Sequence, residues 1–391
     1  EDRERDLWLF SGGDMHPLDP ARGADAFVGP FTRGVQREGR VSVVTPTTDS
    51  RQAFHKLLWV SFDTQSWPDK ELVVVDTYTD SPSEFLVRKA TYDSRLTYIG
   101  FKRPAGMDFS IGLKRNIGTH MASGEFIAHF DDDDFFAPRY LETMVGEIKS
   151  GGAQGVTLSS WFILDVATRE IGFCSPIIFG KQHGLAEDHH WIQEQLYGYG
   201  FSYVYCRQAA LRVPFRDMNL GEDYDFLRRV AEAFGPGAFV LLDDAAGICL
   251  HSQHMRSTSN CLTVRTLRVE EVSSLDVAVA DGFCRNLDLV LKMGPSKERG
   301  VGARCIGASA DDRHPGSLRV LAKLLSGRVL TLDLREHSSV SDAKRRIELE
   351  EGVPPERQRI IFRTNVLEDA RRLVQCGLEW GSTVIVTFEE P

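Results

Sequence analysis

The sequence contains no run of about 18 consecutive apolar residues, the length that a helix needs to cross a bilayer. We therefore predict no membrane-spanning segment, and the charged first residues give no sign of a signal peptide in this form. Basic residues are not in excess, because 46 Lys and Arg stand against 56 Asp and Glu, a net charge of −10. Binding to DNA or RNA depends on neutralising phosphates, so this balance argues against a nucleic-acid partner.

Cysteine is scarce and forms no recognisable motif. The number is odd, no C-x-x-C pair occurs, and this argues against a disulfide framework and against a zinc site of the usual spacing. The seven residues are Cys174, Cys206, Cys249, Cys261, Cys284, Cys305 and Cys376. An Asn-x-Ser/Thr acceptor for N-glycosylation is also lacking. We therefore expect a reducing, cytoplasmic setting.

The 391 residues are 42% hydrophobic, which is enough to bury more than one core and excludes a wholly disordered chain. Changes in composition predict four parts. Residues 1–38 are polar and form an irregular N-terminal arm. Residues 39–262 form a large domain, residues 263–317 a helical extension and linker, and residues 318–391 a small domain.

The large domain has the pattern of an α/β fold. Unbroken apolar runs at 41–44, 72–75 and 125–130 predict buried strands, whereas residues 51–63 and 111–123 have helical spacing. Strand–helix–strand repetition indicates parallel strands in a sheet that is covered on both faces. Ligands of such sheets bind beyond the carboxyl ends of the strands.

Acidic residues stand at two of these strand ends, at Asp76 and at Asp131–Asp134. Neighbouring carboxylates repel each other, and a divalent cation such as Mg²⁺ or Mn²⁺ removes that cost. Protein carboxylates usually share such a cation with substrate phosphates, so the run predicts a metal–diphosphate site. Taken alone, such a run is more often a solvated acidic turn or a helix N-cap.

Four segments together resemble family 2 glycosyltransferases. They are Val41-Ser-Val-Val-Thr-Pro-Thr47, Glu71-Leu-Val-Val-Val-Asp76, Gly112-Leu-Lys-Arg-Asn-Ile-Gly118 and Ala122-Ser-Gly-Glu-Phe-Ile-Ala-His-Phe-Asp-Asp-Asp-Asp134. The resemblance covers roughly residues 40–260 and implies the GT-A fold, a Rossmann-like mixed sheet. It also implies an inverting transferase with a nucleotide-sugar donor, and we expect a UDP-linked sugar and a hydroxyl acceptor.

The resemblance also implies roles for individual residues. The nucleotide would be bound by Pro46, Thr47, Asp76, Arg115, Asp131 and Asp132. Mn²⁺ or Mg²⁺ would be held at the D-x-D pair, Asp131 and Asp133, with His254 from the stretch His251-Ser-Gln-His254 completing the shell or serving only a structural role. One departure from the family concerns the donor base, because Asp76 is followed by Thr77-Tyr78-Thr79 and not by a second Asp with Gly-Ser.

An inverting transferase needs a base on the acceptor side. The segment Leu220-Gly-Glu222-Asp223-Tyr-Asp-Phe226 resembles the family's Glu-Asp motif at the start of a helix. The resemblance makes Asp223 the general base and Glu222 its neighbour. The alternative is that these acidic residues only stabilise the helix N-terminus through the macrodipole.

The small domain resembles ubiquitin from Leu318 to about Glu389, which implies an α+β β-grasp fold. Ser339 and Asp342 have capping-box spacing at the start of its predicted helix. The resemblance places Leu325, Ile361 and Ile385 on an exposed apolar patch, a docking site for a ubiquitin receptor or the proteasome. Alternatively, the patch packs on the transferase. The sequence ends at Glu390-Pro391 without Gly-Gly, so conjugation of this form is not expected.

These observations predict a metal-dependent glycosyltransferase of the hexosyltransferase type, fused to a ubiquitin-like domain. Two other functions stay open. The large domain could be a catalytically inactive adaptor that recruits the ubiquitin and proteasome machinery. It could also be a nucleotidyltransferase, which would release pyrophosphate and would not need Asp223.

Overall fold

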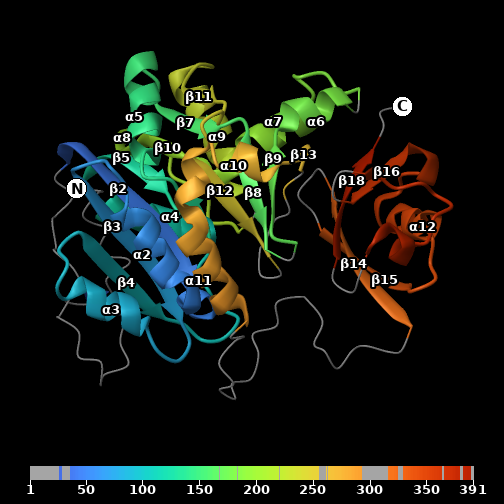
Figure 1. The fold of residues 1–391 in the computed structure, drawn as a ribbon, viewed down its shortest axis with the longest axis horizontal. Coiled ribbons are helices and arrows are strands. Elements are labelled where there is room, and N and C mark those ends of the chain that lie inside the picture. The colour runs from blue at the N-terminus through green and yellow to red at the C-terminus, as the bar shows by residue number, and fades with distance from the viewer. Residues whose placement is uncertain are drawn as a thin grey trace.

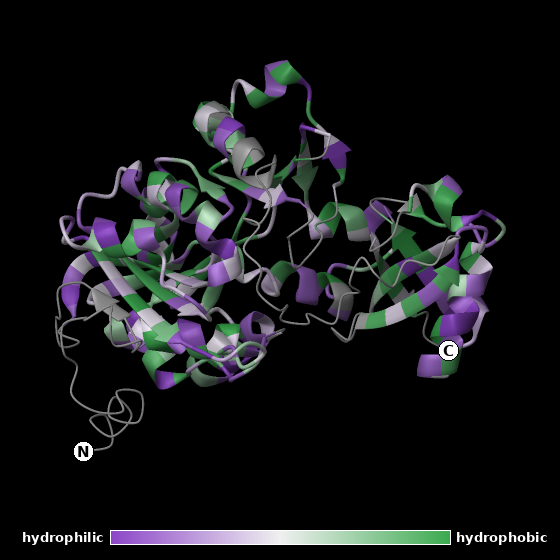
Figure 2. Cartoon of the chain, turned by 90° about the horizontal axis from the view of Figure 1, so that it is seen from below, coloured by the Kyte–Doolittle hydropathy of each residue, from purple (hydrophilic) through white to green (hydrophobic). Residues whose placement is uncertain are grey.

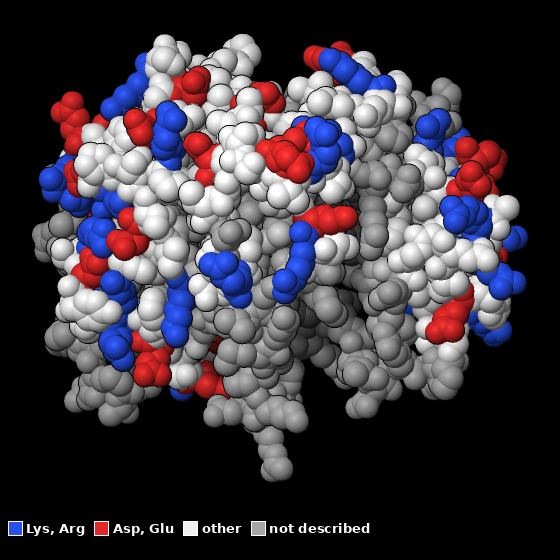
Figure 3. All heavy atoms as spheres, viewed as in Figure 1, with Lys and Arg blue, Asp and Glu red and all other residues white. Residues whose placement is uncertain are grey.

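The computed structural model shows an α/β domain followed by a smaller α+β domain (Figure 1). The residues that it describes are 26–28, 36–166, 168–182, 184–219, 221–254, 261, 263–292, 316–324, 329–362, 365–378 and 382–388. Within these residues, no helix is both long enough and apolar enough to span a bilayer. On the face seen in Figure 3, acidic and basic side chains are interspersed over both domains.

A mixed eight-stranded sheet forms the centre of the large domain. In spatial order its strands are β1 (Ala26–Val28), β4 (Leu96–Lys102), β3 (Lys70–Tyr78), β2 (Arg37–Thr48), β5 (Gly124–His129), β10 (Val204–Cys206), β7 (Gly155–Leu158) and β11 (Phe239–Leu242). The four strands from β4 to β5 are parallel, as predicted. β10 is antiparallel to β5 and to β7, so the sheet is mixed as a whole. The predicted fold class is confirmed.

Alternate residues of the central strands face opposite sides of this sheet. Val43 and Val74 belong to one buried cluster, whereas Val44 and Val73 belong to the other. Because both faces are apolar, helices must cover both. The first face is covered by α2 (His55–Asp63) and α5 (Tyr140–Gly151), and the second by α4 (Ile111–Met121), α8 (Arg207–Arg212) and α9 (Glu222–Phe234).

A second sheet lies beside the first and contains β13 (Arg265–Thr266), β9 (Glu170–Cys174), β8 (Trp161–Asp165), β12 (Cys249–Gln253) and β6 (Phe135–Phe136). From the predicted extension, α11 (Asp281–Lys292) packs Phe283 and Leu287 in one cluster with Phe54 and Phe135. The other elements of this domain are η2 (Asp49–Phe54), α3 (Glu84–Ala90), α6 (Pro176–Gln182), α7 (His190–Tyr197), η3 (Gly200–Ser202), α10 (Val269–Val272) and η4 (Asp276–Ala280).

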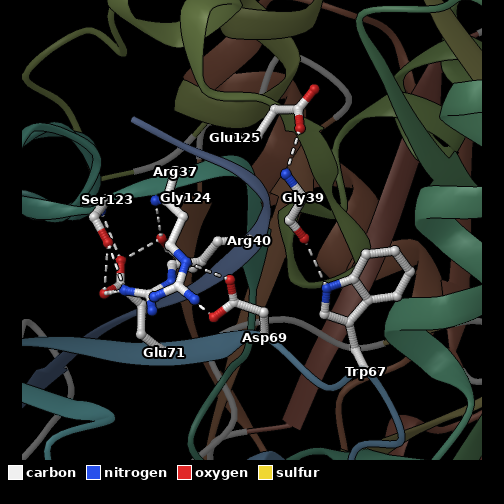
Figure 4. A network of polar contacts seen from close by, with 10 residues as sticks. Arg37, Gly39, Arg40, Trp67, Asp69, Glu71, Ser123, Gly124 and Glu125 are labelled. Carbon is white, nitrogen blue, oxygen red and sulfur yellow. Dashed lines mark hydrogen bonds and ion pairs between the residues drawn. The ribbon is translucent and has the colours of Figure 1, made fainter. Parts of the chain in front are cut away.

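A polar network ties together the amino ends of β2, β3 and β5 (Figure 4). Glu71 is 7% exposed, and its carboxylate accepts hydrogen bonds from Ser42 Oγ at 2.6 Å and from the Ser123 N–H at 2.6 Å. Arg40 donates to Asp69 at 3.0 Å and to Ser123 Oγ at 3.0 Å. These contacts satisfy buried polar groups at the end of the sheet opposite the acidic cluster, and so they hold the strands in register.

The small domain has a five-stranded sheet in the order β15 (Val329–Arg335), β14 (Ser317–Leu324), β18 (Ser382–Phe388), β16 (Gln358–Phe362) and β17 (Asn365–Val366). The helix α12 (Val340–Glu351) packs on one face, and short 3₁₀ turns follow as η6 (Pro355–Arg357) and η7 (Leu373–Cys376). The capping box is present, with Asp342 accepting from the Ser339 N–H at 2.8 Å. In Figure 2 the strands of this sheet are mostly green, as expected for a domain with its own apolar core.

Of the predicted domain limits, 262/263 falls between β12 and β13, whereas 38/39 lies within β2 and 317/318 lies within β14. The arm at 1–38 lies mostly outside the described residues, and of its described part Ala26–Val28 forms β1, paired with β4. Of the predicted helical extension and linker at 263–317, residues 293–315 lie outside the described residues.

Candidate active site

All of the predicted nucleotide-binding residues except Arg115 lie at the carboxyl end of the parallel strands. In the β2–β3 ladder Thr47 lies directly opposite Asp76, and Pro46 opposite Val75. β5 pairs with the other side of β2 and leads directly into Asp131. The parallel direction of the three strands therefore brings segments from three parts of the chain to one sheet edge.

Thr47 connects several of these segments. Its Oγ1 donates to Asp132 Oδ2 at 2.7 Å and lies 3.0 Å from His55 Nε2. Its carbonyl accepts from Lys114 Nζ at 2.8 Å. Burial lowers the pKa of His55 to about 3, with help from the nearby Arg51 charge, so this imidazole is neutral near pH 7. Thr47 is only 3% exposed, so its side chain positions Asp132, while the partly buried Pro46 is nearer the surface.

Asp76 is fully buried within β3. Its Oδ2 accepts from the Tyr98 hydroxyl at 2.6 Å, whereas Oδ1 has no hydrogen-bond partner among the described residues. Burial raises the pKa of Asp76 to about 7, against the effect of the Tyr98 hydrogen bond and the Lys114 charge. A buried oxygen without a partner is costly, so Oδ1 is suited to accept a hydrogen bond from a ligand.

The four aspartates after β5 have four different environments. Asp131 is partly exposed, and its side chain accepts no hydrogen bond from the described residues. Asp132 accepts from Thr47 and, at 2.9 Å, from Arg51 Nε. Asp133 pairs with Arg51 Nη2 at 2.6 Å and with His254 Nε2 at 2.8 Å. The acidic run is therefore not a solvated turn, because three of its members are buried and paired.

Asp134 is the most deeply buried of the four and contacts β12. It accepts from the Ser252 N–H at 2.8 Å and lies 2.7 Å from His251 Nδ1. Burial opposes a charge on His251, but the Asp134 carboxylate outweighs it and raises the pKa of His251 well above its usual value. Asp134 thus fixes the strand that ends beside His254.

The ionisation of the run follows from these partners. Burial, with the charges of Asp134 and Asp133, raises the pKa of Asp131 to about 7. Burial acts in the same direction on Asp133, but Arg51 and His254 outweigh it and lower the pKa of that carboxyl. Asp133 therefore stays ionised, while the raised pKa of Asp131 allows that carboxyl to exchange a proton near neutral pH.

The protein side chains here suit a metal ion whose remaining coordination positions are filled by the substrate. Within the described ranges, no group of three or more His, Cys, Asp and Glu residues gathers to hold a metal by itself. Asp133 and His254 do meet, and His254 stacks on Phe54 with ring centroids 5.4 Å apart. The carboxylate of Asp133 suits Mn²⁺ or Mg²⁺ when phosphate oxygens supply further ligands, whereas the imidazole of His254 suits Mn²⁺ better than the harder Mg²⁺. Arg51 would have to leave Asp133 first.

The candidate base lies on another side of the site, at the start of α9. Asp223 Oδ2 accepts from the Gly200 N–H at 2.9 Å, and Oδ1 accepts from the Tyr224 N–H at 2.8 Å. Burial and the Glu222 charge raise the pKa of Asp223 to about 6. Gly200 is fixed from its other side, because His129 Nδ1 lies 2.9 Å from its carbonyl oxygen.

Arg115 and Glu222 form a buried ion pair with 2.7 Å between Nη1 and Oε1. Both side chains are about 5% exposed, and the guanidinium lies over the Phe215 ring. Glu222 is therefore occupied by Arg115, which leaves Asp223 as the carboxylate that faces Gly200. Besides Glu222, the Arg115 charge interacts with both Asp223 and Asp131, and its predicted contact with the nucleotide stays a prediction.

Comparison with known proteins agrees with this geometry. Residues 42–173 match the family model described as Glycosyl transferase family 2, and residues 319–391 match the Ubiquitin family. The chain joins a family 2 glycosyltransferase domain to a ubiquitin-like domain.

The relatives match these two parts separately. Glycosyltransferase GlyA of Streptococcus pneumoniae serotype 4 is 30% identical over 112 residues, which are 28% of this chain and 15% of GlyA. Ubiquitin-like protein NEDD8-like protein 2 of Dictyostelium discoideum is 35% identical over 65 residues, 17% of this chain and 81% of that protein. Ubiquitin-like protein 1 of Schizosaccharomyces pombe is 34% identical over 65 residues, 17% of this chain and 83% of that protein.

Several residues of the glycosyltransferase domain were not singled out from the sequence. Arg51 pairs with two aspartates, and His129 and Gly200 fix the position of Asp223. His251, which belongs to the stretch quoted with His254, contacts Asp134. Arg51 and Gly200 lie outside the quoted motifs, and Arg51 follows β2 by three residues.

In the ubiquitin-like domain, the predicted exposed patch differs in part from the structure. Ile361 is only 5% exposed and packs against α6 and α7 of the glycosyltransferase domain. Ile385 pairs with Ile361 in the β16–β18 ladder, and Leu325 lies outside the described residues. At Ile361 the structure agrees with the alternative that the patch packs on the transferase, and not with an exposed docking site.

Proposed function

We propose that the glycosyltransferase domain transfers a sugar from a UDP-linked donor to a hydroxyl acceptor, with inversion of the anomeric centre. Asp133 and His254 would hold Mn²⁺ or Mg²⁺, and Asp223 would act as general base. The observation that carries this proposal is the 2.8 Å contact between Asp133 Oδ2 and His254 Nε2, because it joins the D-x-D run to a histidine 121 residues away at the sheet edge.

The metal site supports binding of a diphosphate. Asp133 and His254 offer two ligands, and a nucleoside diphosphate would supply oxygens for the remaining positions. When bound, the cation would stabilise the charge that develops on the leaving diphosphate, as a Lewis acid. Asp131 is partly exposed, and no described residue donates a hydrogen bond to its side chain. We therefore expect it to accept a hydrogen bond from the ribose of the nucleotide sugar.

The choice of uridine is supported by the state of Asp76. Tyr98 already donates to Oδ2, so only Oδ1 is left to accept from a base. The imide of uracil presents one N–H group, whereas the corresponding edge of guanine presents two donor groups and would need both oxygens. Asp76 with its single unsatisfied oxygen therefore matches uracil better.

The acceptor side is supported by Asp223. Burial raises the pKa of Asp223 to about 6, which keeps it mostly ionised at neutral pH and makes it a stronger base than an exposed aspartate. The backbone N–H groups of Gly200 and Tyr224 orient the carboxylate. Asp223 would take the proton of the attacking hydroxyl, and Arg115 would hold Glu222 away from that task.

One observation favours the inactive adaptor as a second candidate. Arg51 pairs with both Asp132 and Asp133 and thereby supplies positive charge where a metal would bind. If this pair never opens, the domain binds neither metal nor donor, and the ubiquitin-like domain would carry the function.

A panel of nucleotide sugars separates these functions. The chain is incubated with UDP-, GDP- and dTDP-sugars in Mn²⁺, in Mg²⁺ and in EDTA, and released nucleotide and pyrophosphate are measured. We expect UDP release from one UDP-sugar with either metal and none in EDTA. A parallel incubation with nucleoside triphosphates and sugar 1-phosphates tests the nucleotidyltransferase, which would join them and release pyrophosphate. No binding of any nucleotide with either metal would favour the adaptor.

A further inference from the structure

The two isoleucines in the middle of β16 point to opposite faces of the ubiquitin-like sheet. Ile360 is 1% exposed and belongs to the domain's own core, with Val384 and Val386 of β18. Ile361 is 5% exposed but belongs to a different cluster, together with Phe179, Ile192 and others of the glycosyltransferase domain. The period of two along a strand thus assigns one side chain to the core and the next to the other domain.

The surface that receives Ile361 is made by α6 and α7. Phe179 on α6 and Ile192 and Leu196 on α7 form its buried part, and Leu185 from the connection packs against it. The two helices lie close together, since a Cβ at Gly180 would be 2.2 Å from Ile192 Cδ1. In Figure 1 the sheet of the ubiquitin-like domain faces the glycosyltransferase domain, while α12 lies on the far side.

This surface is connected to the candidate base. α7 ends at Tyr197, whose carbonyl accepts a hydrogen bond from the Tyr203 hydroxyl. Three residues further along, the Gly200 N–H donates to Asp223. Whatever holds α7 in place therefore also restrains the segment that orients Asp223.

We propose that α6 and α7 form a receptor surface, within the same chain, for the Ile361 face of the ubiquitin-like domain. The partner of this surface is the ubiquitin-like domain of the same chain, because Ile361 is buried against α6 and α7. Ile361 is not part of the core of the ubiquitin-like domain, so the contact takes no side chain from that core. An outside receptor for this face must present an apolar helical surface of the same kind and must displace α6 and α7. The Ile361 face can then contact either α6 and α7 or an outside receptor, but not both. When the ubiquitin-like domain leaves α6 and α7, the segment before Gly200 loses a restraint.

Hydrogen–deuterium exchange of the full-length chain tests the contact from both sides. Ile361→Asp places a charge against Phe179 and Ile192, and amides in 176–197 should exchange about tenfold faster or more, as expected when a local contact is lost. Val374→Asp is the matched control, because Val374 is 42% exposed in the same domain and belongs to neither cluster. The control should leave 176–197 unchanged.

The reciprocal variant is Leu185→Asp, which alters only the receptor side and should speed exchange in β16 and β18 while α12 stays protected. Protection of β14 and α12 in the Ile361→Asp chain reports that the ubiquitin-like domain is still folded. If β14 and α12 lose their protection in the Ile361→Asp chain, that variant is unfolded and the test rests on Leu185→Asp alone. Unchanged exchange in β16 and β18 of the Leu185→Asp chain, or in 176–197 of a folded Ile361→Asp chain, would overturn the proposal. Neither readout depends on transferase activity.

Discussion

Arg51 and Asp133 form an ion pair, with 2.6 Å between Nη2 and Oδ2, at the position where the D-x-D sequence predicts a metal ligand. The guanidinium also contacts Asp132 and lies over the Phe54 ring, which in turn stacks on His254. The acidic run is thus neutralised in part by the chain itself. A metal ion that binds Asp133 must replace the guanidinium of Arg51. We therefore expect Arg51 to move when a metal-bound nucleotide enters the site.

Replacement of Asp133 tests the metal site. Asp133→Asn should weaken UDP binding in Mn²⁺ by about 10-fold or more, a scale seen when a metal's ligand environment is disturbed, and should leave binding in EDTA unchanged. Isothermal titration in both buffers measures the difference. Equal affinity of the wild-type chain for UDP in Mn²⁺ and in EDTA would contradict a metal role.

The same site predicts opposite effects on stability for two neighbours. Asp133→Asn leaves Arg51 and His254 with a weaker partner, so the melting temperature should fall by about 2–4 °C, the shift typical of 1 kcal/mol at this domain size. Asp131→Asn removes a carboxylate whose pKa is raised by burial and like charges, so it should raise the melting temperature at pH 8. Calorimetry of both variants without metal makes the comparison, and a fall for both would argue against charge repulsion at Asp131.

Replacement of Asp223 tests the base. Asp223→Asn should lower turnover by about 100-fold or more, the usual scale for a lost general base, with little change in donor affinity. Because the base must be ionised and its pKa is raised to about 6, wild-type activity should rise through pH 6 and level off above it. Asp225→Asn is the control, since Asp225 is in the same helical turn but pairs with Arg229 at 2.7 Å. A fully active Asp223→Asn chain would place the base elsewhere.

Gly200 tests how closely the base must be positioned. A Cβ there would lie 2.8 Å from Arg115 Nη2 and 3.0 Å from Asp223 Oδ2. Gly200→Ala should therefore displace the carboxylate and lower kcat by roughly 10- to 100-fold, as small misplacements of reacting groups do. Gly146→Ala is the matched control, because nothing lies within 4 Å of a Cβ at Gly146. Steady-state kinetics measures the turnover of both variants. If Gly200→Ala turns over as fast as Gly146→Ala, the position of Gly200 is not important for catalysis.

The buried carboxyl of Asp76 predicts a dependence of stability on pH. Burial raises the pKa of Asp76 to about 7, so the folded chain holds this proton more tightly than the unfolded chain. The resulting stability is present below pH 4 and is lost as pH rises through about 7. Asp76→Asn cannot ionise, so its melting temperature should fall less between pH 5 and pH 8 than that of the wild-type chain. Equal changes in the two proteins would exclude Asp76 as the source.

Much of the fold could be predicted from local pattern. The apolar runs at 41–44 and 72–75 lie in β2 and β3, because strands buried on both faces need apolar residues at consecutive positions. The Ser339–Asp342 spacing predicted the start of α12, since a capping box depends only on residues three positions apart. The helical extension predicted within 263–317 consists of α10, η4 and α11 in its described part, with the short strand β13 before them.

The sequence by itself determined the fold class, the two kinds of domain and the place of the acidic run at a strand end, because these depend on periodicity and on neighbours along the chain. The tertiary structure decided which cation faces Asp133, which amide orients Asp223 and which surface covers Ile361. These pairs are far apart in sequence, as with Asp133 and His254 or Gly200 and Asp223. A pattern along the chain shows which way a side chain faces, but only the packing of distant elements shows what it meets there.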